Sequence, residues 1–446
     1  MTDAREVATR VLVRVSKEGA FASMALDAEL ARSGLDARDA AFATNLVYGA
    51  LRSADELDAV IRPHLHKGKK LDPLVESALR IAAHQLLHLD RVPAHAAVDS
   101  AVKLVRKERG PKVAGFVNAV LRKVASKATT SAVVTPKGLP DWLTAVLRDS
   151  LGEARAAAYL AAAGSVPPID LRVLPSRIAR DALAEKLRAA VPRARIEPCA
   201  HSPLGIRTRG LGDPRRAPGF AEGEFVVQEE GSQLIALLVG AEPGERVLDA
   251  CAGRGGKTTF LGSAVGPRGS VVALDVHEGR LRQIPPLFAS LGLEASLETI
   301  PVDLTVGTGG LEPGFDRVLV DAPCTGLGTL VRRPEILARV GPEDAERMAA
   351  IQLAILERAA TLVKPGGVLV YSVCSPTRAE GADVVARFHV PGFVPRPFGA
   401  EAERLGLSPD ADGILRLGPF LAGSEGGTDG YQIFRWECVD RSRIGS

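Results

Sequence analysis

The sequence predicts a chain in three parts: an all-α segment, a small α+β module, and a doubly wound α/β domain with a mostly parallel sheet. Three observations predict this order. Helical periodicity runs from residue 1 to about 128, strand and helix signals mix over 139–225, and short apolar runs alternate with helical segments from about 228 to 438. We therefore expect domains at 1–128, 139–225 and 226–440, with a linker at 127–138 that contains Pro136 and Gly138.

The stretch from 72 to 89 illustrates the helical pattern of the first segment. Asp72 is a favourable N-cap and Pro73 suits the first helical turn. Apolar residues then recur at spacings of three and four: Val75, Leu79, Ala82, Leu86 and Leu89. The next stretches give two further apolar stripes: Val98, Val102 and Val105, then Phe116, Val120 and Val124. One stripe per helix predicts a helical bundle.

Positive charge is concentrated in two parts of a nearly neutral chain of net charge +3. Residues 101–128 hold eight Lys or Arg against the single acid Glu108, and residues 171–217 hold eleven against four acids. Patches of one sign favour a polyanionic partner such as nucleic acid. A solvated helix face is the alternative reading of either patch alone.

The middle module shows a βαββ-like order. Helical stretches lie around 141–163, followed by a strand at LRV (171–173), a helix near 178–190, and strands at RIEP and GIRTRG. The third part has four short apolar runs that each end in a polar or reactive residue, namely ERVLDA, GSVVALD, FDRVLVDAP and GGVLVYSVC. A helical stripe from Met348 to Leu362 supplies the crossover between the last two, and GYQIFRWECV predicts a final strand.

Composition excludes several classes of protein. Five scattered cysteines give neither a disulfide framework nor a CxxC zinc spacing, so we expect no metal site. The start MTDAREVATR does not resemble a secretory signal, and no apolar run approaches the ~20 residues that span a bilayer. We expect a soluble, monomeric, cytoplasmic protein.

A glycine-rich loop, VLDACAGRGGKTT, joins the first strand of the third part to a helix. Its glycines allow close approach of a ligand to the backbone, and Asp275 ends the next strand, where an acid can bind ribose hydroxyls. A phosphate-binding P-loop would need glycine at Cys251, and the GxGxxG fingerprint fails at Thr258. S-adenosylmethionine fits better, with Asp249 near its amino-acid end. The candidate cofactor residues are Cys251, Ala252, Gly253, Arg254, Gly255, Gly256, Lys257, Asp275, Asp303 and Asp321.

Two cysteines, Cys324 and Cys374, each end a strand-like run where a turn begins. The carboxyl ends of parallel strands share one edge of a sheet, so both thiols could face one pocket, although small buried core residues are the alternative. Addition of a thiolate to C6 of cytosine makes C5 nucleophilic enough to accept a methyl group. An acid near N3, here Asp321, would balance the developing charge. Catalysis by Cys374, Cys324 and Asp321 is therefore our hypothesis.

The combination of CAGRGGKTT, ALD, DAPCTGLGTLVRRPE and YSVCSPTRAE resembles the RNA cytosine-5 methyltransferases. In the first half, LVYGALR, RIAAHQLLHLDRVPAHAAVDSAV and GFVNAVLRKV are similar to the antitermination-factor-like (NusB-like) domain of the bacterial RsmB/Fmu (Sun) family. The resemblance implies a NusB-like RNA-binding domain, an RNA-recognition or linker module, and a Rossmann-like methyltransferase domain. It also implies S-adenosylmethionine as cofactor and small-subunit (16S) ribosomal RNA as substrate.

The same resemblance ranks the two cysteines, which spacing alone cannot do. It implies that Cys374 attacks C6 and that Cys324 assists release of the 5-methylcytosine product. The chain departs from the family pattern at Gly253 and Arg254, which replace Ala and Pro, at Leu174, which replaces Asn, and at Val373, which replaces Thr. Two other functions are open: a non-catalytic RNA-binding or antitermination-type protein with a vestigial cofactor domain, and a P-loop nucleotidase that depends on Lys257.

Overall fold

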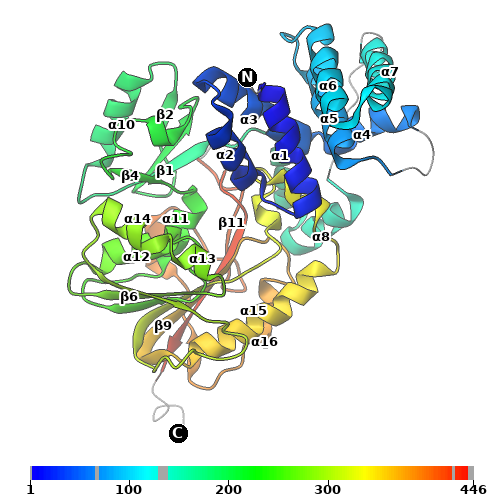
Figure 1. Ribbon diagram of the computed structural model, residues 1–446. Coiled ribbons are helices and arrows are strands. Elements are labelled where there is room, and N and C mark those ends of the chain that lie inside the picture. The colour runs from blue at the N-terminus through cyan, green and yellow to red at the C-terminus, as the bar shows by residue number, and fades with distance from the viewer. Residues whose placement is uncertain (1–2, 66–69, 129–138, 424–426, 440–446) are drawn as a thin grey trace. The chain divides into compact units, whose positions relative to one another are not determined.

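The computed structural model describes residues 3–65, 70–128, 139–423 and 427–439, which form two compact units (Figure 1). The first comprises residues 1–140 together with the distant segment Arg332–Val340, and the second comprises Asp141–Val331 and Gly341–Ser446. Most of the predicted linker at 127–138 lies outside the described residues. Its first two positions, 127 and 128, belong to the last helix of the first unit.

The first unit is helical, as its periodicity predicted. Its elements are α1 (Ala4–Glu18), α2 (Ala22–Ser33), α3 (Ala37–Arg52), α4 (Ala54–Ile61), η1 (Arg62–His64), α5 (Pro73–His88), α6 (Ala94–Arg109) and α7 (Pro111–Ala128). Asp72 caps α5, since its side chain accepts hydrogen bonds from the N–H groups of Leu74 and Val75. Such a cap typically stabilises a helix by about 1 kcal/mol. The predicted stripe residues Val75, Leu79 and Ala82 are buried in the bundle core.

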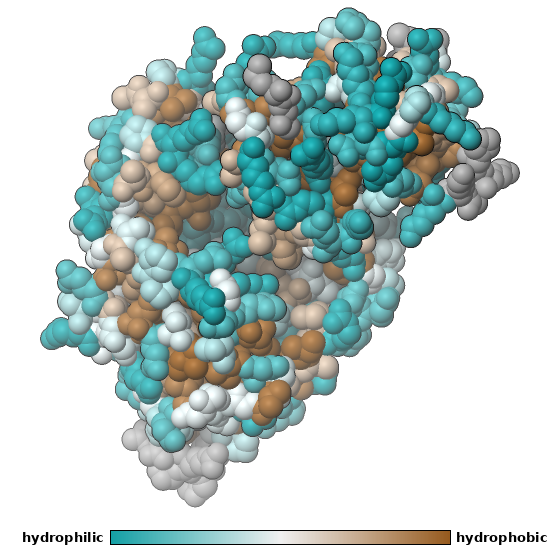
Figure 2. Space-filling view, in the orientation of Figure 1, coloured by the Kyte–Doolittle hydropathy of each residue, from teal (hydrophilic) through white to brown (hydrophobic). Residues whose placement is uncertain are grey.

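The basic residues of α6 and α7 lie on the outside of this bundle. Val105, Val120 and Val124 are buried, whereas the neighbouring basic side chains are exposed: Lys103, Arg106, Lys107, Arg109, Lys112, Arg122 and Lys123. Figure 2 shows hydrophilic side chains projecting from this part of the surface. The helical stripes therefore leave a basic outer face.

The segment Arg332–Val340 packs against the first helices of the bundle. Its short helix η4 (Pro334–Ala338) carries the buried Glu335, whose Oε1 accepts a hydrogen bond of 3.0 Å from the N–H of Ala22. The guanidinium groups of Arg333 and Arg339 lie 5.5 Å and 5.3 Å from the ring centroid of Phe21, within cation–π range. This segment completes the first unit although it lies far along the chain.

The second unit begins with α8 (Asp141–Leu151) and α9 (Glu153–Ala163) and a small antiparallel sheet of order β2-β3-β1-β4. Its elements are β1 (Ile169–Val173), α10 (Arg180–Ala190), β2 (Arg195–Pro198), β3 (Gly205–Arg209), η2 (Pro214–Arg216) and β4 (Phe225–Val227). The predicted βαββ order is confirmed, with β4 added. Two of the eleven basic residues counted over 171–217, Arg172 and Arg207, are buried, so the expected patch is smaller at the surface.

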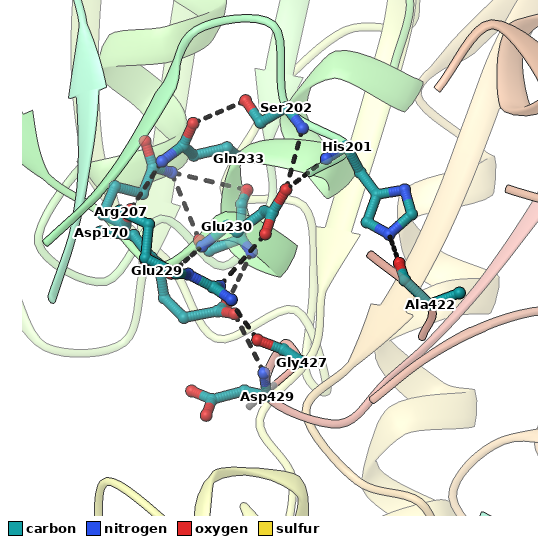
Figure 3. A network of polar contacts seen from close by, with 12 residues as sticks. Asp170, His201, Ser202, Arg207, Glu229, Glu230, Gln233, Ala422, Gly427 and Asp429 are labelled. Carbon is teal, nitrogen blue, oxygen red and sulfur yellow. Dashed lines mark hydrogen bonds and ion pairs between the residues drawn. The ribbon is translucent and has the colours of Figure 1, made fainter. Parts of the chain in front are cut away.

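Arg207 is buried because it serves as a cation inside the unit. Its guanidinium donates to Asp170 (2.9 Å), to Glu230 (3.1 Å) and to the carbonyl of Gly427 (2.9 Å). Figure 3 shows Glu230 in turn accepting the backbone N–H groups of His201 and Ser202. Buried charges are tolerated when they are paired and hydrogen-bonded in this way. The network ties the small sheet to the start of helix α11 (Glu230–Leu238).

A second sheet is the centre of the unit, and eight strands of it lie within the described residues. Its main path runs β10-β12-β9-β8-β5-β6-β7, and β11 pairs with β12. The pairs β9·β8, β8·β5, β5·β6 and β6·β7 are parallel, while β12 is antiparallel to β9. The strands are β5 (Arg246–Asp249), β6 (Ser270–Asp275), β7 (Ser296–Pro301), β8 (Phe315–Asp321), β9 (Val363–Val373), β10 (Phe393–Pro395), β11 (Leu415–Leu417) and β12 (Tyr431–Cys438). The mostly parallel, doubly wound α/β fold is confirmed.

Helices cover both faces of this sheet, as Figure 1 shows. They are α11 (Glu230–Leu238), α12 (Gly256–Val265), α13 (Glu278–Leu281), α14 (Ile284–Leu291), α15 (Asp344–Ala360), α16 (Ala382–Arg387) and α17 (Gly399–Arg404). Successive residues such as Val247 and Leu248 point into different cores, one against α11, α12 and α14, the other against α15 and α16. In the part of the chain that the structure describes, no helix is long and apolar enough to cross a membrane.

Candidate active site

The predicted functional residues gather at the carboxyl edge of the parallel strands. The strands β9, β8, β5 and β6 are consecutive neighbours, and three of them end in acids, at Asp321, Asp249 and Asp275. Asp321 pairs in register with Ser372, two residues before Cys374. The edge of an open parallel sheet is where ligands bind in such folds. Strand order thus brings together residues that lie more than a hundred positions apart.

The glycine loop between β5 and α12 is fixed to the end of β6. Gly253 and Gly255 adopt positive φ angles of 56° and 86°, which L side chains rarely adopt. The N–H of Gly253 donates to Asp275 over 3.0 Å, and the N–H of His277 donates to the other oxygen of the same carboxylate over 2.8 Å. A Cβ added at Gly253 would meet no atom within 4 Å, so the loop is open on that side. A ligand can therefore approach the backbone beside Asp275.

Asp249 provides the test of whether a cationic ligand group fits this loop. Its Oδ2 accepts a hydrogen bond of 2.7 Å from Thr258, while its buried Oδ1 has no partner among the described residues. Burial raises the pKa of Asp249 to about 6, although the hydrogen bond from Thr258 lowers it. An unpaired buried carboxylate oxygen is costly unless a ligand supplies a donor. The amino group of an amino-acid cofactor would be such a donor, so the residues present fit S-adenosylmethionine.

Lys257 and Asp321 form an ion pair at the centre of the edge. The Lys257 Nζ lies 2.7 Å from Asp321 Oδ2, and Ser372 Oγ donates to Asp321 Oδ1 over 2.7 Å. Burial lowers the pKa of Lys257, but the charge and hydrogen bond of Asp321, together with the charges of Asp249 and Cys374, raise it by more, so the net pKa is raised. The lysine is therefore a fixed cation that orients the carboxylate.

The two thiols lie side by side. The Sγ atoms of Cys324 and Cys374 are 2.8 Å apart, and both residues are partly buried. The hydrogen bond with Cys374, and burial after it, raise the pKa of Cys324 well above its usual value. Either sulfur can be the donor in this contact, and the raised pKa favours a protonated Cys324. The hypothesis that both thiols face one site agrees with this geometry.

The remaining predicted residues lie around the glycine loop. Ala252 is buried and its N–H donates to Leu274, whereas Arg254 is exposed. Burial raises the pKa of Cys251 well above its usual value, so this thiol is a poor nucleophile. Asp303 is exposed after β7, where it accepts hydrogen bonds from the N–H and hydroxyl of Thr305. The carboxylate of Asp303 thus has hydrogen-bond donors within its own turn, and this geometry does not require a ligand.

Several residues at this edge were not assigned from the sequence. Ser372 and Thr258 bind the carboxylates of Asp321 and Asp249, and both occur inside motifs whose other members were assigned. Val276, directly after Asp275, is 55% exposed, so an apolar side chain is accessible at this edge. The position of Thr258 and Ser372 inside the glycine-loop and cysteine motifs was the available signal. Among the described residues, no group of three or more His, Cys, Asp or Glu could hold a metal ion.

Two family models match separate parts of the chain. Residues 2–126 match the NusB family, and residues 236–390 match a model described as 16S rRNA methyltransferase RsmB/F. The first match covers the helices α1–α7, and the second contains both cysteines, the glycine loop and Asp321. The helical bundle and the cofactor-type sheet thus each resemble a known family.

Similar proteins cover nearly the whole chain. The ribosomal RNA small subunit methyltransferase B of Thermus thermophilus is 36% identical over 92% of this chain and 95% of its own. The protein of the same name from Pseudomonas putida is 32% identical over 98% of this chain and 99% of its own. The crystal structure of PH0851 superposes with a TM-score of 0.82 at 23% identity, covering 97% of this chain and 98% of that one. That structure shares the fold.

Proposed function

The chain belongs to the RsmB/F family of 16S rRNA methyltransferases, and from this premise we propose that it methylates carbon 5 of a cytosine in small-subunit ribosomal RNA. The methyl donor in this proposal is S-adenosylmethionine. The observation that carries the proposal is the pair of thiols 2.8 Å apart beside the Lys257–Asp321 ion pair. Cytosine C5 methylation needs a sulfur nucleophile and an acid at one place.

The cofactor would be held by residues at the carboxyl edge of β5 and β6. The unpaired Oδ1 of Asp249 would accept its amino group, Asp275 its ribose hydroxyls, and the loop around Gly253 its carboxylate. When bound, the cofactor supplies an electrophilic methyl group on a sulfonium. Val276 offers an exposed apolar surface beside Asp275 for the adenine base of the cofactor.

Cys374 begins the reaction in this proposal. Its thiolate adds to C6 of the cytosine, forming an S–C6 bond, and the electrons of the C5–C6 double bond make C5 nucleophilic. The S–H of Cys324 donates to the thiolate of Cys374 before attack, which keeps the anion in position. Asp321, held by Lys257 and Ser372, binds the polar edge of the base. C5 would then form a bond to the methyl carbon, and the bond from that carbon to the sulfonium sulfur would break with its electron pair left on the sulfur.

Release reverses the covalent step. The proton at C5 leaves to solvent, the C5–C6 double bond re-forms, and the S–C6 bond breaks with its electron pair on the sulfur of Cys374. Cys324 stabilises this leaving thiolate through its S–H, because its raised pKa keeps it protonated. The two cysteines therefore have different tasks although they lie in contact.

The substrate would be bound mainly through charge. The exposed basic residues of α6 and α7 and those that remain at the surface of 171–217 are suited to RNA phosphates. A flipped-out cytosine must leave its stack to reach the thiols. Cytoplasmic location and a monomeric state stay predictions.

The test is to measure both the product and the intermediate. Nucleoside mass spectrometry of small-subunit RNA treated with the full chain should find 5-methylcytosine. A Cys324→Ala variant should accumulate a covalent protein–RNA adduct, and Cys324→Ala/Cys374→Ala should form none. Full methylation by Cys374→Ala would overturn the assignment, and failure to bind S-adenosylmethionine with any RNA would favour the non-catalytic RNA-binding alternative.

A further inference from the structure

One buried carboxylate next to the thiols has no task in the reaction described above. Glu380 follows the turn after β9, is completely buried, and accepts five hydrogen bonds from neutral donors. Its Oε1 accepts from the N–H of Thr325 (2.8 Å) and from Gln352 (3.1 Å). Its Oε2 accepts from the hydroxyls of Thr325 (2.6 Å), Ser375 and Thr377 (3.1 Å).

The donors of Glu380 directly follow the two cysteines. Thr325 is the residue after Cys324, and Ser375 is the residue after Cys374. One carboxylate therefore binds both cysteine-bearing turns within one residue of each thiol. The hydroxyls of Thr325 and Ser375 also lie 3.3 Å from each other. The two cysteine-bearing turns therefore share one hydrogen-bond acceptor.

The same network also holds the residue before Cys324. Gln352, on α15, donates to the carbonyl of Pro323 over 3.0 Å while it binds Glu380. The hydroxyl of Tyr371, on β9, donates to Gln352 (3.0 Å) and to the backbone carbonyl of Glu380 (2.6 Å). Gln352, Tyr371 and Glu380 are buried, so water competes little for the hydrogen bonds between them, whereas Pro323 itself is exposed. The turn of Cys324 is thus fixed on both sides of the thiol.

We propose that Glu380 is a positioning residue that sets the separation of the Cys324 and Cys374 thiols, so that attack and release act on the same cytosine; the roles of attack and release rest on the proposed function. A carboxylate suits this place because both its oxygens accept hydrogen bonds. The amide introduced by Glu380→Gln could keep its oxygen toward the N–H donors and its NH₂ toward the hydroxyls, which can accept as well as donate. Alanine would leave the N–H of Thr325 without an acceptor.

Capture of the two thiols by phenylarsine oxide tests the geometry without the reaction. The arsenic(III) forms two As–S bonds, and its oxygen leaves as water with the two thiol protons. The full-length protein should bind one arsenical tightly, and both Cys324→Ser and Cys374→Ser should lose this binding. We expect the arsenical Kd to rise at least about tenfold in Glu380→Ala, because the effective concentration of the second thiol falls, and to stay within about threefold in Glu380→Gln.

Two controls separate this effect from a general loss of structure. Glu230→Gln changes another fully buried carboxylate of the same unit, in the network of Figure 3, and should leave arsenical affinity unchanged. Thr325→Val keeps the shape of that side chain but removes one hydroxyl donor, and it should weaken capture even if Glu380→Ala does not fold. Wild-type capture by a folded Glu380→Ala, or by Thr325→Val, overturns the proposal.

Steady-state methylation gives the second readout. A displacement of about 1 Å between reacting groups can cost about 10²-fold in rate, so Glu380→Ala should lower kcat by that order while KM for RNA stays within about threefold. Glu380→Gln should restore most of kcat. If Cys374→Ala methylates normally, the proposed function fails, and arsenical capture still decides the position of the thiols.

Discussion

The backbone N–H of Gly328 donates a hydrogen bond to the carbonyl oxygen of Cys374 over 3.0 Å. Gly328 lies in the short helix η3 (Leu327–Thr329) after Cys324, so this bond joins the two cysteine-bearing turns through their backbones. The carbonyl of Gly328 accepts the N–H of Gly430 over 2.8 Å. Three segments that are distant in sequence thus meet within a few ångströms of the thiols.

Substitution of Gly328 by alanine should separate these segments. A Cβ there would overlap the carbonyl group of Gly430 and lie 2.9 Å from the carbonyl oxygen of Cys374, and neither backbone can move freely. We expect Gly328→Ala to lower the free energy of unfolding by about 1–3 kcal/mol, as overpacking does. Chemical denaturation measures this, with Gly115→Ala, where a Cβ meets nothing within 4 Å, as the control. Equal stability of the two variants would contradict the described packing.

Mild oxidation should join the two thiols. Diamide would take two electrons and two protons from Cys324 and Cys374, which are in contact, and would itself become the hydrazine. We expect loss of methylation, a mass lower by two hydrogen atoms, and full recovery with dithiothreitol. Cys438→Ser should behave like wild type, whereas Cys374→Ser should not form the disulfide. A disulfide that forms in Cys374→Ser would show that another thiol is within reach.

Removal of the Asp321 charge should expose the effect of burial on Lys257. Burial lowers the pKa of Lys257, and Asp321 is the largest of the groups that raise it, ahead of Asp249 and Cys374. In Asp321→Asn desolvation dominates, so the pKa should fall and the neutral amine should react with acylating reagents at least about one pH unit lower. Peptide mass spectrometry across pH measures this, with the exposed Lys103 as an internal reference. An unchanged labelling midpoint would mean that Asp321 does not hold the lysine charge.

Acid should destabilise the helical unit through His84. Burial, followed by the charges of His88 and Arg52, lowers the pKa of His84 from 6.5 to about 4, and neither ring nitrogen has a hydrogen-bond partner among the described residues. The unfolded chain binds this proton more readily, so stability is complete above pH 6.5 and falls between pH 6.5 and about 4, by up to ~3 kcal/mol. The free energy of unfolding of His84→Leu should depend less on pH in that window. Identical pH profiles would refute this.

RNA affinity should depend on the basic outer face of α6 and α7. Charge reversal in Lys103→Glu and Lys123→Glu should weaken binding of small-subunit RNA and reduce the slope of log K against log salt by about 1 for each lost phosphate contact. Lys17→Glu, which reverses an exposed charge on α1, is the matched control. Filter binding at several salt concentrations measures both quantities. An equal effect of the control would point to net charge alone.

Local patterns predicted the elements well. Asp72 and Pro73 define the start of α5 because capping depends only on neighbours in the sequence. The apolar runs that end in Asp249, Asp275 and Asp321 became strands because buried parallel strands need continuous apolar residues. The positions of Cys324 and Cys374 at the ends of predicted strands also indicated that both lie at the carboxyl edge of the sheet. These features depend on composition over a few residues.

Long-range pairing could not be predicted in the same way. A count of charges could not show that Arg207 is buried with Asp170 and Glu230, because the partners come from three separate segments. Nor could it show that Glu380 binds both cysteine turns, since hydroxyl donors such as Thr325 occur throughout the chain. Hydrogen-bond partners inside a core depend on how distant segments pack together, and the spacing of residues in the sequence does not predict that packing.

The segment Arg332–Val340 makes the helical unit discontinuous in the gene. A cut at residue 140 would remove the helices but leave behind η4, whose Glu335 binds the N–H of Ala22. An exchange of residues 1–140 alone would leave the N–H of Ala22 without the acceptor that Glu335 provides in this chain. Any exchange of this unit must carry two separated stretches of coding sequence, one of them within the loop that follows Cys324.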